Sequence, residues 1–269
     1  MMFSLGSINR IGLALLLSVV LVSPVLASQP VQITSNPGED FAPSISRDGS
    51  FMVYVSDTSG NLDLWMKYLA PGIQPPDRRL TFHSTEDKSP TISPDGKQVA
   101  FVSNRSDPRG DIYVLDLQKV GQSDPSPLVQ GKGGEADPAW SADQKYIYFA
   151  SGTNEVSIYK IDVTSGEKSL VLKKGGINLS SSSKGEYLAF ATGDTKSDLK
   201  VLNLKTNSLI ELSHGPEIDV LPGWSNNSIF FTRYSDDTNR DGQLGIDDNP
   251  NIWKLDFVEG RAVNLRQLT

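Results

Sequence analysis

One short segment recurs along the chain, and this repetition constrains the fold more than any other feature of the sequence. It is clearest at 40–57 (DFAPSISRDGSFMVYVSD), 87–104 (DKSPTISPDGKQVAFVSN) and 135–152 (EADPAWSADQKYIYFASG). A weaker copy lies at 177–193, and a copy with a shortened turn lies at 219–235. The turn residues of these copies are Gly49, Gly96, Gln144, Gly185 and Asn227. Successive turns are 47, 48, 41 and 42 residues apart, which is the length of one four-stranded propeller blade.

Within each copy the residue pattern predicts β-strands. In the second copy a short strand at 90–93 leads into a Pro-Asp-Gly turn, and an apolar strand at 99–102 follows. Third strands are expected at 63–69, 111–117, 156–162, 198–204 and 251–257. β-branched and aromatic residues recur with period-two alternation, and no long helical pattern interrupts them. The chain is therefore predicted to be all-β, a propeller of five four-stranded blades.

Outer strands leave the number of blades open. The five copies end on outer-strand signals at 78–81, 127–129, 170–172, 210–212 and 266–269. A sixth signal, VQIT at 31–34, precedes the first copy, so a partial sixth blade is the alternative. The third strands share an aromatic position, which we expect to pack between neighbouring sheets: Trp65, Tyr113, Tyr159 and Trp253.

The N-terminus has the pattern of an export signal. Arg10 is the only charge in residues 1–27 and precedes the apolar run 11–22. Val25 and Ala27 occupy the small-residue positions before a cleavage point, and the run is shorter than the roughly 20 residues that span a bilayer. We predict a signal peptide at 1–27, a propeller domain at 28–269 and a periplasmic or secreted protein. An uncleaved anchor is the alternative.

Composition excludes several classes of function. A net charge of −7 argues against nucleic acid or anionic lipid as the main partner. The absence of cysteine excludes disulfides, acylation at cysteine and a thiol nucleophile. No Gly-x-Ser-x-Gly elbow and no phosphate-binding glycine loop occurs in the sequence.

The second copy resembles the TolB-type β-propeller repeat. It carries Asp87, Pro90, the turn 93–96 and the aromatic Tyr113, and the resemblance extends over about residues 31–269. TolB is a periplasmic component of the Tol–Pal envelope system with an α/β domain before a six-bladed propeller. Only residues 28–39 separate the predicted cleavage point from the first copy, so we expect the chain to lack that α/β domain. Prolyl-peptidase-like hydrolases and oligogalacturonate lyases share the repeat, which therefore indicates fold better than function.

Four copies place a carboxylate three residues before the blade proline: Asp40, Asp87, Glu135 and Asp219. In a propeller one repeat position recurs around the axis, so these side chains are candidates for binding a basic partner segment or a cation. The alternative is that each accepts hydrogen bonds from backbone N–H groups of its own turn.

Two histidines, His83 and His214, follow equivalent outer strands. In oligogalacturonate-lyase-like propellers, histidines on such connections help to bind a metal, but two fall short of a typical ligand set. We favour a non-enzymatic, monomeric propeller that binds a protein or cell-envelope component, without nucleic acid and without stable membrane insertion after cleavage. A metal-dependent polysaccharide-lyase-like or peptidase-associated propeller is the alternative.

Residues 237–248, DTNRDGQLGIDD, have the spacing of an EF-hand-type calcium loop. Oxygen-bearing side chains occupy positions 1, 3 and 5, the turn glycine is at 6, a backbone carbonyl ligand is expected at 7, and Asp replaces the usual Glu at 12. The predicted ligands are Asp237, Asn239, Asp241, Gln243 and Asp248. Alternate residues are required because the chain wraps around the ion. We predict a structural Ca²⁺ site, with a solvated acidic hairpin loop as the alternative.

Overall fold

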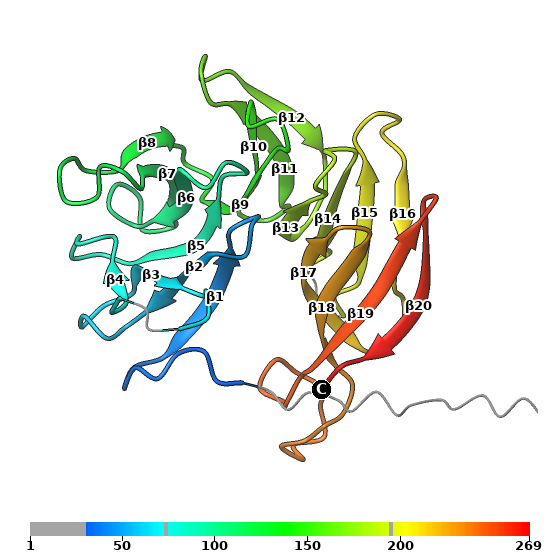
Figure 1. Cartoon of the computed structure of the whole chain (residues 1–269). Helices are drawn as coiled ribbons and strands as arrows, with labels where there is room; N and C mark the ends of the chain where they lie inside the picture. The colour runs from blue at the N-terminus through cyan, green and yellow to red at the C-terminus, as the bar shows by residue number, and fades with distance from the viewer. Residues whose placement is uncertain (1–30, 73–74, 194–195) are drawn as a thin grey trace, which may run out of the picture. The chain divides into compact units, whose positions relative to one another are not determined.

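The structure is a computed structural model that describes residues 31–72, 75–193 and 196–269 (Figure 1). The predicted signal peptide, residues 1–27, lies outside the described residues. The chain divides into two compact units, Met1–Ser35 and Asn36–Thr269, and every described strand belongs to the second. Residues 31–34, where the sequence predicts an outer strand, form no strand, so that expectation is wrong. Each described outer strand pairs with the third strand of its own sheet, and no described third strand precedes residues 31–34.

Five four-stranded antiparallel sheets make up the second unit. The first contains β1 (Asp40–Ile45), β2 (Phe51–Ser56), β3 (Asp63–Tyr68) and β4 (Arg78–Arg79). The second contains β5 (Asp87–Ile92), β6 (Gln98–Ser103), β7 (Asp111–Asp116) and β8 (Ser126–Val129). The third contains β9 (Glu135–Trp140), β10 (Tyr146–Ser151), β11 (Ser157–Asp162) and β12 (Lys168–Leu172). The fourth contains β13 (Ile177–Ser181), β14 (Tyr187–Ala191), β15 (Leu199–Asn203) and β16 (Leu209–Glu211). The fifth contains β17 (Ile218–Ser225), β18 (Ser228–Tyr234), β19 (Asn251–Val258) and β20 (Arg261–Gln267).

Strands pair in chain order within each sheet, from an inner first strand to an outer fourth strand (Figure 1). The prediction of an all-β propeller with five blades is confirmed. Within the described residues there is no helix long and apolar enough to cross a membrane.

The turn between the first two strands of each sheet is built as the repeat predicts. Gly96 has φ of 72°, and its N–H donates to the carbonyl of Ser93 over 2.9 Å. Gln144 occupies the equivalent place in the third sheet with φ of 63° and bonds to Ser141 in the same way at 3.0 Å. The turn geometry is therefore kept even where glycine, which adopts positive φ without a steric penalty, is replaced.

Each inner strand also contains a β-bulge that the sequence did not indicate. The residues at the bulges have φ between 48° and 55°: Ala42, Ser89, Asp137, Asn178 and Leu221. Positive φ is unfavourable for residues with a Cβ atom, by about 1–3 kcal/mol. Its recurrence in every sheet shows that the bulge belongs to the repeat.

Four apolar cores join the sheets, each between two sheets that follow one another in the chain. Each of the last four sheets contributes one phenylalanine from its second strand to the core that it shares with the preceding sheet. These residues are Phe101, Phe149, Phe190 and Phe231. Such burial is the main favourable term in folding, about 25 cal/mol per Å² of apolar surface.

The aromatic position in the third strands behaves as predicted in three sheets. Tyr113, Tyr159 and Trp253 pack in or against the cores shared with the preceding sheets. Trp65 does not join any of the four cores, because no described sheet precedes the first. Consecutive sheets pack on one another through their inner strands. Among the described strands, no such packing joins β1 to the fifth sheet.

Candidate functional site

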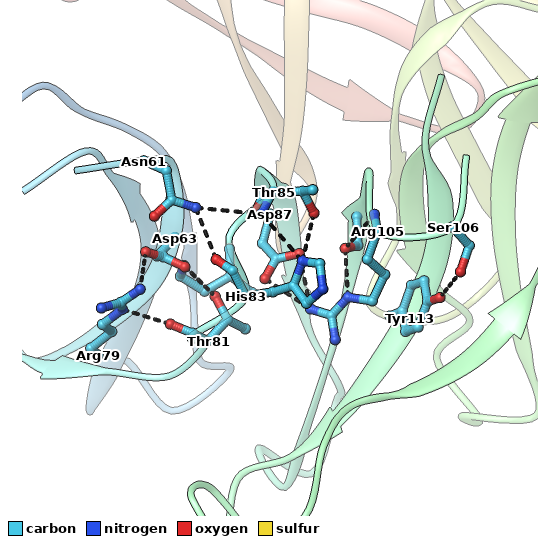
Figure 2. A network of polar contacts seen from close by, with 12 residues as sticks. Asn61, Asp63, Arg79, Thr81, His83, Thr85, Asp87, Arg105, Ser106 and Tyr113 are labelled. Carbon is cyan, nitrogen blue, oxygen red and sulfur yellow. Dashed lines mark hydrogen bonds and ion pairs between the residues drawn. The ribbon is translucent and has the colours of Figure 1, made fainter. Parts of the chain in front are cut away.

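A network of polar side chains lies where the first sheet meets the second (Figure 2). Asp63, the first residue of β3, is fully buried, and Nη2 of Arg79 lies 2.6 Å from its Oδ2. The hydroxyl of Thr81 accepts the N–H of Leu64 at 3.0 Å and donates to Oδ1 of Asp63 at 3.4 Å. The hydroxyl of Ser59 donates to the same carboxylate. These bonds replace the water that burial removes from Asp63.

Asp87, the first residue of β5, lies in the same network and is also fully buried. Nη2 of Arg105 donates to both of its carboxylate oxygens, at 3.1 and 3.0 Å. The Arg105 guanidinium lies 4.7 Å from the centre of the Tyr113 ring, and its Nε donates to the hydroxyl of Ser103 at 2.8 Å. The N–H of Asp87 donates to the carbonyl of Leu62 at 2.9 Å, which ties the two sheets together.

Related ion pairs recur at two other junctions between sheets. In the third sheet, Nζ of Lys168 lies 3.9 Å from Oε1 of the buried Glu135. In the fifth sheet, Nε and Nη2 of Arg233 each donate to the buried Asp219 at 2.7 Å. Asp40 differs, since it is half-buried and accepts hydrogen bonds of 3.3 and 3.4 Å from Nδ2 of Asn36.

Three of the four predicted partner-binding carboxylates, Asp87, Glu135 and Asp219, thus lie inside junctions between sheets. Their neighbours are the Arg and Lys side chains described above, not the backbone N–H groups that the alternative predicted. A buried carboxylate is stable when a cation and hydrogen-bond donors replace water, and these pairs provide that replacement. Contact of the four carboxylates with a partner stays a prediction.

Burial raises the pKa of two junction carboxyl groups. For Asp63 the loss of hydration is the main cause, and the hydrogen bond from Ser59 and the charge of Arg79 oppose it. For Glu135 burial again raises the pKa most, the charge of Lys168 opposes it, and the nearby Asp111 adds to it. Oε2 of Glu135 has no hydrogen-bond partner among the described residues. Glu135 is therefore the least satisfied of the junction carboxylates.

His83 lies at the edge of the network, on the connection that follows β4 (Figure 2). Its Nδ1 accepts the N–H of Thr85 at 3.2 Å and lies 2.8 Å from the Thr85 hydroxyl. Nδ2 of Asn61 donates to the carbonyls of His83 and Thr85 at 3.0 and 3.1 Å. His214 is exposed. Within the described part of the chain, no three His, Cys, Asp or Glu side chains form a group that could hold a metal ion.

A cavity of about 660 Å³ opens beside this network. It is lined by Leu80–His83, Arg105 and Gly121–Pro125. Phe82 in this lining is 61% exposed, and the guanidinium of Arg79 lies 5.1 Å from its ring centre. Aromatic residues and arginine are enriched in protein–protein interfaces relative to the rest of the surface. The sequence did not single out Phe82, because it lies between outer and inner strands, where the repeat has no fixed residue.

The predicted calcium loop connects β18 to β19 in the fifth sheet. The carboxylate of Asp237 accepts the N–H groups of Asp241 and Gly242 at 3.2 and 2.9 Å. Oδ1 of Asn239 accepts the N–H of Asp241 at 3.0 Å, and Oδ1 of Asp241 accepts that of Gln243 at 2.8 Å. Side chains at positions 1, 3 and 5 thus bond to later residues of the same loop.

Asp248, at position 12, is buried and closes the loop from within. Its Oδ1 accepts the N–H groups of Thr238 and Asn239 at 2.6 and 3.1 Å, and its Oδ2 accepts that of Gly245 at 2.9 Å. These bonds lower the pKa of Asp248, the one from Gly245 most. Asp248 would have to give up some of these bonds to bind an ion. The other predicted ligands have the oxygen chemistry of a calcium site: Asp237, Asn239, Asp241 and the carbonyl of Gln243.

Successive antiparallel sheets, joined by shared apolar cores and by backbone hydrogen bonds at the start of the inner strands, define a β-propeller built from one repeated blade. The chain belongs to the TolB β-propeller domain family, whose sequence profile matches residues 78–247. The resemblance drawn from the repeat is therefore confirmed. No curated protein matches the chain.

Solved structures share the fold at low sequence identity. A protein assigned as TolB from Agrobacterium tumefaciens is 19% identical, with a TM-score of 0.69 over 87% of this chain and 81% of that chain. TolB from Acinetobacter baumannii is 18% identical, with a TM-score of 0.61 over 77% of this chain and 54% of that chain. An oligogalacturonate lyase in complex with manganese is 14% identical, with a TM-score of 0.54 over 84% of this chain and 64% of that chain. One fold thus occurs in proteins of different function.

Proposed function

We propose that this chain is an exported, non-enzymatic propeller that binds a protein or cell-envelope component. The observation that carries the proposal is the exposed ring of Phe82 beside the 660 Å³ cavity at the junction of the first two sheets. A rigid sheet framework holds both in place, and loops on such frameworks commonly carry function. The lining combines apolar, cationic and hydroxyl groups, which suits a protein segment with mixed side chains.

The polar groups nearby support binding in preference to catalysis. Asp63 and Asp87 are fully buried and paired with arginines, so their oxygens are occupied within the fold. Nδ1 of His83 accepts the N–H of its own loop. A general base needs a free acceptor within hydrogen-bond reach of its substrate, and these groups are committed to other partners.

Calcium is proposed as a structural ion in the loop 237–248. The supporting feature is the recurrence of oxygen donors at Asp237, Asn239 and Asp241, each folded back onto the loop. The ion would be bound by the side-chain oxygens of Asp237, Asn239 and Asp241, and it would add stability only while bound.

The experiment is capture from an envelope extract with immobilised protein, in chelator and in millimolar calcium, followed by mass spectrometry. Phe82→Ala should lose the captured component. Leu170→Ala is the matched control, because Leu170 is 55% exposed on the outer strand of the third sheet, and it should retain capture. Equal capture by both variants would contradict the proposed site. Cleavage of oligogalacturonate with manganese, abolished by His83→Ala, would replace the proposal with the enzymatic alternative.

A further inference from the structure

Consecutive sheets pack on one another in a fixed way. The inner strand of each later sheet lies against the preceding sheet, and hydrogen bonds join inner strands across the junctions. The N–H of Ile92 donates to Oγ of Ser44 at 3.1 Å, and the N–H of Trp224 donates to Oγ of Ser180 at 3.1 Å. Inner strands pack on one another at every junction from the first sheet to the fifth, so this packing is a property of the repeat, and the bond to a serine hydroxyl occurs at two of the four junctions.

The first sheet has the same interface positions without a sheet to cover them. Ile45 corresponds to Ile92, four residues before the turn glycine, yet Ile45 is 60% exposed and Ile92 is 8% exposed. Pro43 is exposed, whereas the equivalent Pro90 is buried. Trp65 lies at the shared aromatic position but joins none of the four cores.

The fifth sheet has the complementary uncovered face. Ile112 of the second sheet pairs with Val102 and is fully buried against the third sheet. Ile252 has the equivalent register in the fifth sheet, where it pairs with Thr232, and it is 39% exposed. The face that would receive a following sheet is therefore open.

Part of the first sheet's uncovered face is capped by its own polar groups. At the position where later sheets have phenylalanine, this sheet has Tyr54, whose hydroxyl donates to Asp77 at 2.8 Å and accepts from Asn36 at 3.0 Å. Tyr54 is 1% exposed, so on this face the second strand is covered and the apolar inner strand is exposed.

We propose that the exposed inner strand of the first sheet and the uncovered face of the fifth sheet form a binding surface for one further four-stranded antiparallel sheet of the same repeat. The inner strand of that sheet would lie on Ile252, and its middle strands would cover Ile45, as each junction already does. Continuity with the repeated interface identifies the occupant as a blade. This surface does not include Phe82, so the inference goes beyond the function proposed above.

The test supplies the full chain with a sheet of known sequence. A copy of residues 82–129 is added after Thr269, because RQLT at 266–269 matches RRLT at 78–81 and the repeat then continues in register. The chain has no cysteine, so Ile45→Cys, Ile252→Cys and the control Leu170→Cys each provide a single thiol for labelling. A second extension has the same composition in shuffled order.

With the repeat extension, the thiols of Ile45→Cys and Ile252→Cys should be labelled at least about tenfold more slowly, since labelling then requires local opening. Labelling of Leu170→Cys should not change, and the melting temperature should rise. Unchanged labelling at both test positions, or equal protection by the shuffled extension, overturns the proposal. The proposal is also overturned if the thiols of the protein without an extension become protected as the protein concentration increases. In that case a second copy of the chain is the occupant.

Discussion

Arg233 donates two hydrogen bonds of 2.7 Å, one from Nε and one from Nη2, to the two carboxylate oxygens of Asp219. Asp219 is buried, only 12% of the Arg233 side chain is exposed, and the guanidinium lies 4.9 Å from the centre of the Trp253 ring. The pKa of Arg233 is raised, mainly by its hydrogen bonds to Asp219. The two residues face each other in the pairing of β17 with β18, so this ion pair, inside the fold, links two strands of the fifth sheet.

Removing one member of this pair should be strongly destabilising. Asp219→Ala leaves the Arg233 charge buried and unpaired, and it should lower the free energy of unfolding by about 3–5 kcal/mol. Asp107→Ala is the matched control, because Arg109 bonds to Asp107 with similar geometry but is 46% exposed. The control should cost much less, because solvent screens an exposed ion pair. Urea denaturation followed by circular dichroism measures both, and similar costs would contradict the structural role of the pair.

Glu135 should make stability depend on pH. Because its pKa is raised above the usual 4.5, the folded state holds this proton more tightly than the unfolded state. Its contribution to stability therefore falls as the pH rises from about 4.5 through the raised pKa. Glu135→Gln should remove this loss, so the variant should gain stability relative to wild type between pH 4.5 and neutrality. Parallel pH profiles of the free energy of unfolding would show that Glu135 does not titrate in this range.

Calcium should stabilise the wild-type protein if the loop 237–248 binds it. At about tenfold excess over a dissociation constant near 10⁻⁴–10⁻³ M, the expected gain is about 1.4 kcal/mol. Asp237→Ala/Asp241→Ala should abolish the gain, because it removes two oxygen donors. Thermal unfolding in chelator and in millimolar calcium provides the measurement. The calcium site is contradicted if calcium does not raise the melting temperature of the wild-type protein, or if it raises that of the double variant equally. The segment would then be a solvated acidic hairpin loop.

The two tryptophans at the shared aromatic position should differ in their contribution. Trp253→Ala removes a ring packed against the core of the last two sheets and should cost about 3–5 kcal/mol. Trp65→Ala should cost less, because Trp65 joins none of the four cores. Denaturation of the two variants under one condition tests the difference. Equal costs would mean that Trp65 packs against a sheet in solution.

Export predicts a defined mature N-terminus. Intact-mass measurement of protein recovered from outside the cytoplasm should give a chain that begins at Ser28. A mass that includes residues 1–27 would favour the uncleaved anchor.

The sequence predicted the sheets well because local patterns determine them. The third strand expected at 63–69 is β3, Asp63–Tyr68, and the one expected at 111–117 is β7, Asp111–Asp116. Alternation and turn residues act within a few positions, so a repeat shows them several times. The aromatic position failed at Trp65, because that prediction assumed a sheet on each side of every blade.

The junction pairs could not be predicted in the same way. Arg105 follows the second strand, Arg233 lies within one, and Lys168 begins an outer strand, yet all three neighbour a repeat-position carboxylate. The cations thus come from different places in the repeat, and no periodicity reveals them. The exposure of Phe82 likewise depends on how two sheets meet, which a linear pattern does not contain.

The four cores between five sheets also determine how the molecule opens. Each middle sheet is held by two neighbours and each end sheet by one, so the stability resembles that of a linear array with nearest-neighbour coupling. Amide hydrogens should exchange fastest in β20, where every residue is exposed, and slowest in strands such as β10 of the third sheet. The first and last blades should fray in the native state while the middle three remain folded, and a sheet that bridged both ends would suppress this breathing.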